Sequence, residues 1–197
     1  DGDRVDVTNL QRQVVHREES IGTPKATSAA ATLAGINPAV RVEAIVDRVG
    51  GERLESLVRA ADVVLDCSDN FTTRHAINRA CVRHRKPLVS GAGIRFDGQL
   101  AVFDLRREGA PCYDCLFPEN AAEEEERCAT MGVFAPLVGI IGTMQAMEAI
   151  KLLAGIGEPL SGRLALFDAL AGRWHEVRLA RDPHCRVCSA PHAAAAD

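Results

Sequence analysis

The sequence predicts an α/β fold, with a doubly wound sheet in its first half and an antiparallel portion in its second half. Three observations predict it. Short apolar runs alternate with helical patterns between residues 22 and 93, strand-like pairs separated by turn residues follow, and two C-x-x-C pairs stand about seventy residues apart. Alternation of strands and helices at short intervals is typical of a parallel sheet with helices on both faces.

A helix, a strand and a second helix are expected over residues 22–61. Residues 22–38, "GTPKATSAAATLAGINP", predict a helix in which Thr23 is suited to the cap and Pro24 to the first helical position. Residues 40–46, "VRVEAIV", predict a strand, and 51–61, "GERLESLVRAA", a short amphipathic helix.

The same alternation continues to residue 93. Residues 62–70, "DVVLDCSDN", form an apolar run that ends in polar residues, as a buried parallel strand does. A helix over 71–86 and a strand over 87–93 follow. The front half therefore predicts parallel strands joined by helices.

The second half has a different pattern. Two strand-like pieces flank Asp97-Gly98, a favourable hairpin turn. A long apolar helix is expected over 133–154, and two more strands around a glycine-containing turn within 162–181. Polar residues interrupt the apolar helix, which favours a buried helix over a membrane span.

Size and composition limit the possibilities. The chain has 197 residues, which predicts a single domain over 1–189 and a disordered tail over 190–197. A net charge of −4 argues against binding to a nucleic-acid backbone, and 4% aromatic residues argue against base stacking. Seven cysteines, an odd number, disfavour a disulfide scaffold, and their spacing favours a cytoplasmic location.

The two C-x-x-C pairs predict one structural zinc site. Four thiolates surround Zn²⁺ as a tetrahedron, and a closed site of this kind leaves no position open for catalysis. Two independent structural or redox pairs are the alternative. The ligands of the predicted site are Cys112, Cys115, Cys185 and Cys188.

Polar side chains also cluster at the start of the chain and after the strand of 62–70. Arginine and lysine suit phosphates, a carboxylate at a strand end can hold Mg²⁺, and ligands of α/β sheets bind outside the carboxyl ends of strands. Each residue also has a simpler interpretation: Asp69-Asn70 can cap the next helix, and Arg12 and Lys25 can be solvated surface residues.

Several stretches together resemble a known family: "DGDRVDVTNLQRQ", "GTPK", "LDCSDNFTTR", "PLVSGAGIRFDGQLAVF", "PCYDCLFPE", "GVFAPLVGIIGTMQAMEAIKLLAG" and "CRVC". They are similar to the ThiF/MoeB/HesA adenylyltransferases, the bacterial relatives of ubiquitin-activating enzymes. The resemblance extends to Cys188 and implies a Rossmann-like doubly wound sheet. The family also has a glycine-rich loop and a first βαβ unit before the stretch that matches Asp1, so we expect such a unit to precede it.

The resemblance implies roles for particular residues. Asp1 matches the residue that holds the ribose, and Asn9 and Arg12 match residues that reach the triphosphate. Lys25 matches the phosphate-binding lysine. Asp69 matches the magnesium-associated aspartate, with Asn70 beside the nucleotide and Arg74 in a weaker, supporting role. The four cysteines match the zinc ligands. Cys128 matches a cysteine that in some members takes part in sulfur transfer or covalent linkage, and an ordinary loop cysteine is the alternative.

The implied reaction transfers AMP from ATP to the C-terminal Gly-Gly carboxylate of a small ubiquitin-like sulfur carrier, MoaD-like or ThiS-like. It serves molybdenum cofactor or thiamine biosynthesis and needs a separate sulfur donor. The resemblance implies ATP, Mg²⁺ and Zn²⁺ as cofactors, and a homodimer. Two other classes stay open: a non-catalytic, zinc-stapled partner subunit of an activating enzyme, and an NAD-dependent oxidoreductase.

Overall fold

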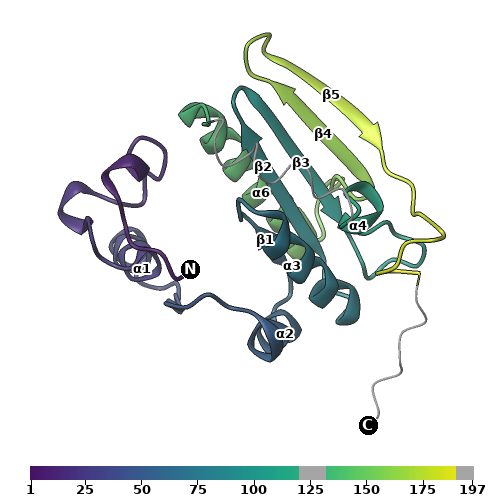
Figure 1. Ribbon diagram of the computed structural model, residues 1–197, viewed down its shortest axis with the longest axis horizontal. Helices are drawn as coiled ribbons and strands as arrows, with labels where there is room; N and C mark the ends of the chain where they lie inside the picture. Colours follow the sequence, from purple (N-terminus) through teal and green to yellow (C-terminus); the bar gives the residue numbers. More distant parts are fainter. Residues whose placement is uncertain (120–131, 190–197) are drawn as a thin grey trace. The chain divides into compact units, whose positions relative to one another are not determined.

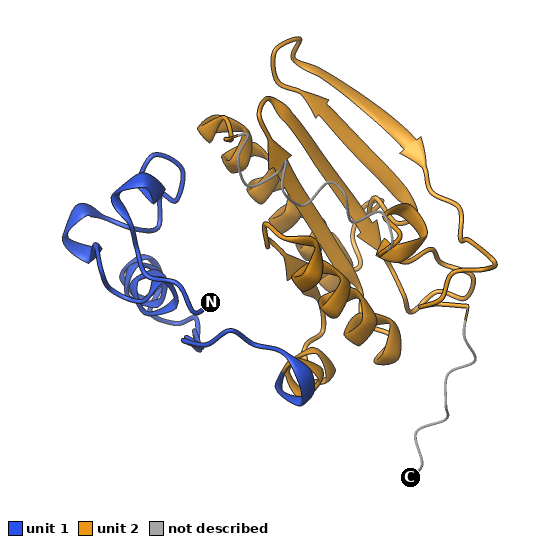
Figure 2. Cartoon of the chain, viewed as in Figure 1, with its two compact units in different colours: residues 1–53 blue, residues 54–197 orange. Residues whose placement is uncertain are grey.

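The computed structural model describes residues 1–119 and 132–189. These residues form two compact units, 1–53 and 54–197, coloured separately in Figure 2. No observation tests the expectation of one domain over 1–189, and the expected tail of 190–197 lies outside the described residues. The main elements are α1 (Lys25–Ile36), α2 (Gly51–Ala60), β1 (Val64–Asp66), α3 (Phe71–Arg83), β2 (Leu88–Ile94), β3 (Asp97–Phe103), α4 (Tyr113–Leu116), α6 (Ala135–Ala154), β4 (Arg163–Asp168) and β5 (Arg173–Arg178).

The first unit contains α1 and two short 3-10 turns, Val7–Asn9 and Glu18–Ser20. The alanine-rich helix forms as expected, but Thr23 does not cap it. Pro24 takes the cap position in extended conformation without a side-chain bond, and its carbonyl accepts from Ser28 N at 3.0 Å. Helix α1 therefore begins one residue later than the sequence suggested.

The strand expected over 40–46 is wrong. The segment has no regular structure; Val40 N donates to Asn37 O at 3.2 Å, and the Asp1 amino group donates to Ile45 O at 3.0 Å. A strand needs a neighbour that completes its ladder of backbone hydrogen bonds. Among the described residues, no strand pairs with this segment.

The second unit is built on one five-stranded mixed sheet with the order β1-β2-β3-β4-β5 (Figure 1). Strands β1 and β2 are parallel, with Val64 opposite Leu88 and Asp66 opposite Ser90. Strands β2 to β5 run antiparallel to their neighbours. The α/β class with an antiparallel C-terminal portion is confirmed, but the parallel part among the described strands is a single pair.

The first hairpin turn lies two residues earlier than expected. Ile94 pairs with Asp97, so Arg95 and Phe96 make the turn, and Arg95 has a φ of +50°. Asp97-Gly98 therefore lies inside β3. A Cβ at Gly98 would stand 2.8 Å from side-chain atoms of Leu137 and Ile141 on α6. This glycine permits close helix packing and does not make the turn.

Side-chain alternation along the strands divides the core between two faces of the sheet. Leu88, Ala101, Phe103 and Leu164 belong to one cluster, together with Ala80 to Val82 of α3 and three of the zinc-candidate cysteines. Their strand neighbours, including Val89, Leu100, Val102 and Ala165, belong to a second cluster with Leu152 of α6. Because successive strand side chains point to opposite faces, α3 and α6 cover opposite faces. The prediction of helices on both faces is confirmed.

Helix α6 is long and apolar enough to cross a membrane by length and composition alone. It packs instead along β2 and β3 (Figure 1). The side chains buried on it are Leu137, Ile141, Gln145, Glu148, Ala149 and Leu152. Apolar side chains also lie on its exposed side, among them Ile150 and Leu153.

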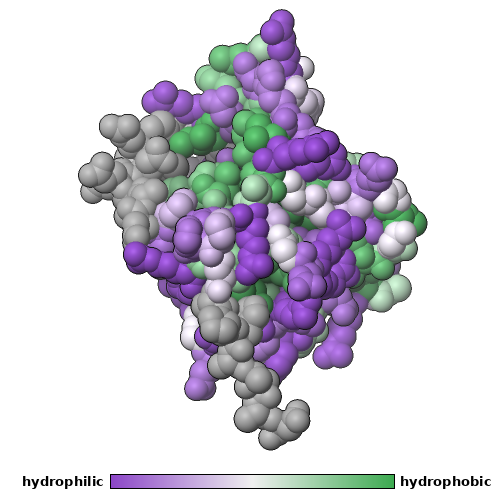
Figure 3. Space-filling model, turned by 90° about the vertical axis from the view of Figure 1, so that its right-hand side faces the viewer, coloured by the Kyte–Doolittle hydropathy of each residue, from purple (hydrophilic) through white to green (hydrophobic). Residues whose placement is uncertain are grey.

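The far edge of the sheet is open to solvent. All six residues of β5 are exposed, and the ring of Trp174 stacks on Phe167 of β4 with centroids 4.5 Å apart. On the face drawn in Figure 3, hydrophobic residues gather in the upper half among hydrophilic ones. Stacking across the strand pair shields part of the aromatic surface that this edge would otherwise expose.

Candidate functional site

The carboxyl end of β1 is organised around a buried carboxylate, Asp66, which is 1% exposed. Its Oδ1 accepts hydrogen bonds from Ser68 N at 3.0 Å and from Ser68 Oγ at 2.6 Å. Its Oδ2 accepts from Ser90 Oγ on β2 at 3.3 Å and lies 3.5 Å from Arg74 Nη1. Asp66 therefore ties the loop that follows β1 to the neighbouring strand.

Arg74, in the first turns of α3, completes this arrangement. Its side chain is 8% exposed, and it donates to Ser90 Oγ, to the Gly91 carbonyl at 3.3 and 3.4 Å, and to the Ser68 carbonyl. A buried guanidinium with several planar donors fixes its acceptors in direction as well as distance. Arg74 thus holds the ends of both parallel strands and the loop of 67–70.

Asp69 and Asn70 lie in that anchored loop. Asn70 caps α3, since its Oδ1 accepts from Thr73 N at 2.8 Å, and its Nδ2 contacts Asp69 Oδ1 at 3.4 Å. The capping interpretation of Asn70 is therefore observed, and capping does not occupy the whole amide. Asp69 is exposed, so its carboxylate is accessible to a cation.

The other candidate residues belong to the first unit. Asp1 Oδ1 accepts from Asp3 N at 2.8 Å, Asn9 Oδ1 accepts from Asp6 N at 3.1 Å, and Arg12 Nη1 donates to Thr8 O at 3.1 Å. All three are short-range bonds, and the last two shape the turn of 6–12. They leave most of the Arg12 donors unused.

Lys25 is held by a residue to which the sequence analysis assigned no role. Its Nζ lies 3.1 Å from Asp3 Oδ2, and Arg48 Nη2 lies 3.3 Å from Asp3 Oδ1. The hydrogen bond from Lys25 lowers the pKa of Asp3 below its usual value. An ammonium group has three donors, so Lys25 can bind Asp3 and still donate to phosphate oxygens.

The candidate residues thus form two sets. Asp1, Asn9, Arg12 and Lys25 stand in the unit of 1–53, and Asp69 and Asn70 in the unit of 54–197.

Gln145 of α6 also belongs to this site, although its sequence pattern had not singled it out. This side chain is 3% exposed, and its Nε2 donates to Asp66 O at 2.8 Å and to Val89 O at 3.3 Å. Its Oε1 accepts from Cys67 Sγ at 3.6 Å. The available signal was a glutamine inside an otherwise apolar helix, because a buried amide requires partners.

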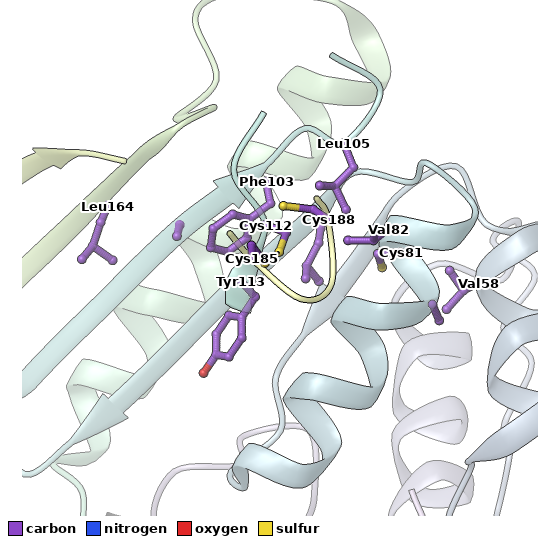
Figure 4. Packing of buried hydrophobic residues seen from close by; sticks show 13 residues of the cluster. Val58, Cys81, Val82, Phe103, Leu105, Cys112, Tyr113, Leu164, Cys185 and Cys188 are labelled. Carbon is purple, nitrogen blue, oxygen red and sulfur yellow. Dashed lines mark hydrogen bonds between the residues drawn. The ribbon is translucent and has the colours of Figure 1, made fainter. Parts of the chain in front are cut away.

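The four predicted zinc ligands lie together, with all sulfur atoms within 4.8 Å of one another. The Cys112–Cys115, Cys112–Cys185 and Cys115–Cys188 sulfur distances are 3.9, 3.7 and 3.5 Å. A tetrahedral site with Zn–S bonds of ~2.3 Å has edges of about 3.8 Å, so the cluster has the size that zinc requires. Three of these cysteines are buried beside Phe103 (Figure 4).

Hydrogen bonds within the cluster favour the thiolate form of Cys115. Backbone N–H groups of Cys112 and Asp182 donate to Cys115 Sγ, both at 3.5 Å. With the bond from the Cys112 thiol as the largest cause, they lower the pKa of Cys115 to about 5, while burial raises the pKa of Cys185 to about 11. The lowered pKa favours a thiolate at Cys115, whereas Cys185 would lose its proton only on binding a metal.

The other cysteines differ in position. Cys81 is buried in α3, as expected for a packing residue. Cys67 is exposed in the loop after β1, because the strand ends at Asp66. Cys128 lies outside the described residues.

Comparison with known proteins agrees with this architecture. The ThiF family model matches residues 1–187. A molybdopterin-synthase adenylyltransferase of Salmonella typhimurium is 45% identical over 191 residues, which are 95% of this chain and 75% of that protein. A sulfur carrier protein ThiS adenylyltransferase of Escherichia coli is 44% identical over 98% of this chain and 76% of its own length.

Among solved structures, the Escherichia coli protein MccB with ATP is similar in fold, with a TM-score of 0.79. Identity is 22%, and the match covers 95% of this chain but only 57% of MccB, so this chain spans little more than half the length of that protein. The family match over nearly the whole chain, together with relatives above 40% identity, shows that the chain belongs to the ThiF family.

Proposed function

We propose that this protein is an adenylyltransferase that activates the C-terminal carboxylate of a small ubiquitin-like sulfur carrier protein. The supporting observation is that relatives 44% to 46% identical over nearly the whole chain are named adenylyltransferases of molybdopterin synthase or of sulfur carrier proteins. The carriers those relatives act on point to a MoaD-like or ThiS-like substrate here, and to molybdenum cofactor or thiamine biosynthesis.

The reaction joins two anions. The carrier carboxylate attacks the α-phosphorus of ATP, a carrier acyl-adenylate forms, and pyrophosphate leaves. The carboxylate is already ionised at pH 7, so no general base is required. The obstacle is charge repulsion, and catalysis consists of alignment and charge neutralisation.

The residues of this chain are suited to that task. Lys25, held in place by Asp3, and the unused donors of Arg12 would contact phosphate oxygens. Asp1 would hold the ribose, and Asn9 would support the turn that carries Arg12. Asp69 has the exposure required of a Mg²⁺ ligand, and Mg²⁺ would supply charge neutralisation at the phosphates. Asn70 would stand beside the nucleotide.

The four-cysteine cluster is suited to Zn²⁺ by its size and its donor set. Its proposed task is structural, since all four ligands come from the protein. It would join the segment of 112–115 to the segment of 185–188.

Further parts of the proposal concern the setting of the enzyme. The exposed apolar side chains of α6 support a homodimer, with Ile150 at 57% and Leu153 at 59% exposure. We also propose a cytoplasmic location, a separate sulfur donor and, for Cys128, a role in sulfur transfer or covalent linkage. Sedimentation of the wild type and of Leu153→Glu tests the dimer.

ATP–pyrophosphate exchange tests the activity, with MoaD-like and ThiS-like carriers supplied separately and with any residues that precede Asp1 in the cell retained. Exchange should depend on a carrier. Asp69→Asn should reduce it at least 100-fold, since an electrostatic contact made in the transition state is worth roughly that factor. Asp62→Asn is the matched control, because Asp62 is exposed just before β1, at the opposite end of that strand.

The rival functions give different results. A non-catalytic partner subunit would support no exchange with any carrier, and an NAD-dependent oxidoreductase would bind NADH and not exchange pyrophosphate. Either outcome would refute the proposal, as would normal exchange in Asp69→Asn.

A further inference from the structure

Asn78 stands in the middle of α3 with no exposed surface. Its Oδ1 accepts a hydrogen bond from Tyr113 N at 3.0 Å, and its Nδ2 lies 3.6 Å from Cys112 Sγ. The backbone N–H of Tyr113 is only a donor, so it must face the amide oxygen. The orientation of the amide is therefore determined, and its N–H group points at the sulfur.

These two bonds meet at the beginning of α4. Cys112 caps that helix, and Tyr113 is its first residue. The turn places the sulfurs of Cys112 and Cys115 on the same side, 3.9 Å apart. Asn78 thus fixes both the backbone that presents the first cysteine pair and one of its sulfur atoms.

A second contact lies one turn earlier on the same face of α3. His75 Nδ1 is 3.5 Å from Asp114 Oδ1, and Asp114 Oδ2 accepts from Cys185 Sγ at 3.5 Å. Residues 75 and 78 are neighbours on a helix surface. Both cysteine pairs are therefore connected to one face of α3.

The other end of α3 carries the proposed magnesium ligand. Asn70 caps the helix, Asp69 precedes it, and Arg74 binds the ends of β1 and β2. Eight residues separate Asn70 from Asn78, about 12 Å at 1.5 Å per residue. A short, hydrogen-bonded helix moves as one body, so a constraint at Asn78 also limits the motion of the Asp69-Asn70 loop.

We propose that Asn78 is a positioning residue that joins the four-cysteine metal cluster to helix α3, and through α3 holds the loop of Asp69 and Asn70. Its N–H donates to the Cys112 thiolate, and its carbonyl oxygen holds the α4 turn. The part that concerns the cluster is independent of the proposed reaction, whereas the part that concerns Asp69 rests on the proposed function.

Cobalt substitution tests the bond to sulfur without any assay of activity. A hydrogen bond stabilises the sulfur lone pairs, so its loss in Asn78→Ala should move the thiolate-to-cobalt charge-transfer band to longer wavelength. Zinc release to a chelator should rise 10- to 100-fold, the usual effect of removing a partner of a metal ligand. Arg83→Ala is the matched control, since Arg83 lies on the same helix with a side chain 68% exposed and bound to Glu55.

The two bonds of Asn78 can be separated. Asn78→Asp retains an oxygen for Tyr113 N but has no N–H for sulfur, so it should reproduce the spectral change and the faster zinc release. An unchanged band and unchanged release in both variants would overturn the proposal.

The wild-type protein provides a test that does not depend on how the variants fold. With ¹¹³Cd in the cluster and ¹⁵N in the asparagine side chains, the Asn78 amide proton should show scalar coupling to cadmium through the N–H···S bond. Absence of this coupling would contradict the assignment.

The link to Asp69 has its own measurement. Hydrogen exchange of the amides of 69–74 should accelerate in Asn78→Ala relative to Arg83→Ala, and the apparent KM for ATP in the exchange assay should rise more than kcat falls. Faster zinc release with unchanged exchange at 69–74 would limit Asn78 to the metal cluster. A protein that passes the cobalt and cadmium tests but never exchanges pyrophosphate would refute the proposed function alone.

Discussion

Gly91 on β2 lies where the glutamine of α6 meets the sheet. A Cβ added to Gly91 would stand 2.4 Å from Gln145 Cδ and 2.5 Å from its Oε1. Gln145 cannot move without losing its bonds to Asp66 O and Val89 O. We therefore expect Gly91→Ala to expel the Gln145 amide from its place beside the parallel strands.

The magnitude follows from these contacts. Two hydrogen bonds at about 1 kcal/mol each contribute ~2 kcal/mol to stability. Overpacking adds at least about 1 kcal/mol. Replacing a strand glycine returns about 0.5–1 kcal/mol, because alanine has less backbone freedom to lose on folding. The expected net loss in the free energy of unfolding is about 2 kcal/mol.

Urea denaturation of the wild type, Gly91→Ala and Gly93→Ala measures this loss. Gly93 is the matched control, because a Cβ there would meet its nearest side-chain atom at 3.5 Å, an ordinary contact. In a double-mutant cycle, Gln145→Ala should cost less in the Gly91→Ala background, with a coupling of about 1 kcal/mol or more. Equal stability of the two glycine variants within about 0.5 kcal/mol would refute the reasoning.

Two further changes test charged groups. Glu148 is 1% exposed and binds Lys151 Nζ at 2.6 Å and Leu160 N at 2.7 Å. Glu148→Ala should lower the urea-unfolding free energy by about 3 kcal/mol, since Leu160 N loses its acceptor and Lys151, which keeps only the Glu158 carbonyl at 3.2 Å, loses its charge partner. Because Lys25 lowers the pKa of Asp3, this carboxylate stabilises the fold above its unfolded pKa and loses that effect as pH falls through the folded pKa. Asp3→Asn should therefore reduce stability by less than about 1 kcal/mol near pH 6, discounted for the exposed side chain, and by progressively less as pH falls below the unfolded pKa. A difference that does not shrink as pH falls would contradict this assignment.

Local pattern was sufficient for most elements of the second unit. Strand β1, helix α3, strand β2 and the β4–β5 pair lie where alternation and turn residues placed them. The elements, and the closeness of the two cysteines within each C-x-x-C pair, depend on residues within a few positions of one another. The four cysteines also came together as predicted, but the meeting of the two pairs depends on the fold, since they stand about seventy residues apart.

The two wrong expectations, a strand over 40–46 and a turn at Asp97-Gly98, concern features that depend on distant parts of the chain. The segment 40–46 has the residues of a strand, but strand formation depends on a partner that local pattern cannot supply. Asp97-Gly98 has the residues of a turn, but the register of β2 and β3 and the contact of α6 with Gly98 place the turn at Arg95 and Phe96. In the first case the partner that a strand needs is missing among the described residues, and in the second a tertiary contact overrode a local preference.

Two residues that local pattern did not single out also depend on long-range contacts. Gln145 and Asn78 are polar residues buried on helices, and the partners of each lie far along the chain: Asp66 and Val89 for Gln145, Cys112 and Tyr113 for Asn78. A buried amide is costly unless every donor and acceptor is satisfied, so its presence in an apolar face indicates a long-range partner without naming it. The structure identifies these partners. Gln145 joins α6 to the ends of the parallel strands, and Asn78 joins α3 to the cysteine cluster. Polar residues inside predicted core helices are therefore the positions in this sequence that best indicate long-range contacts near the site. The cobalt spectrum of Asn78→Ala tests this inference at the cysteine cluster. The double-mutant cycle at Gly91 and Gln145 tests it at the ends of the parallel strands.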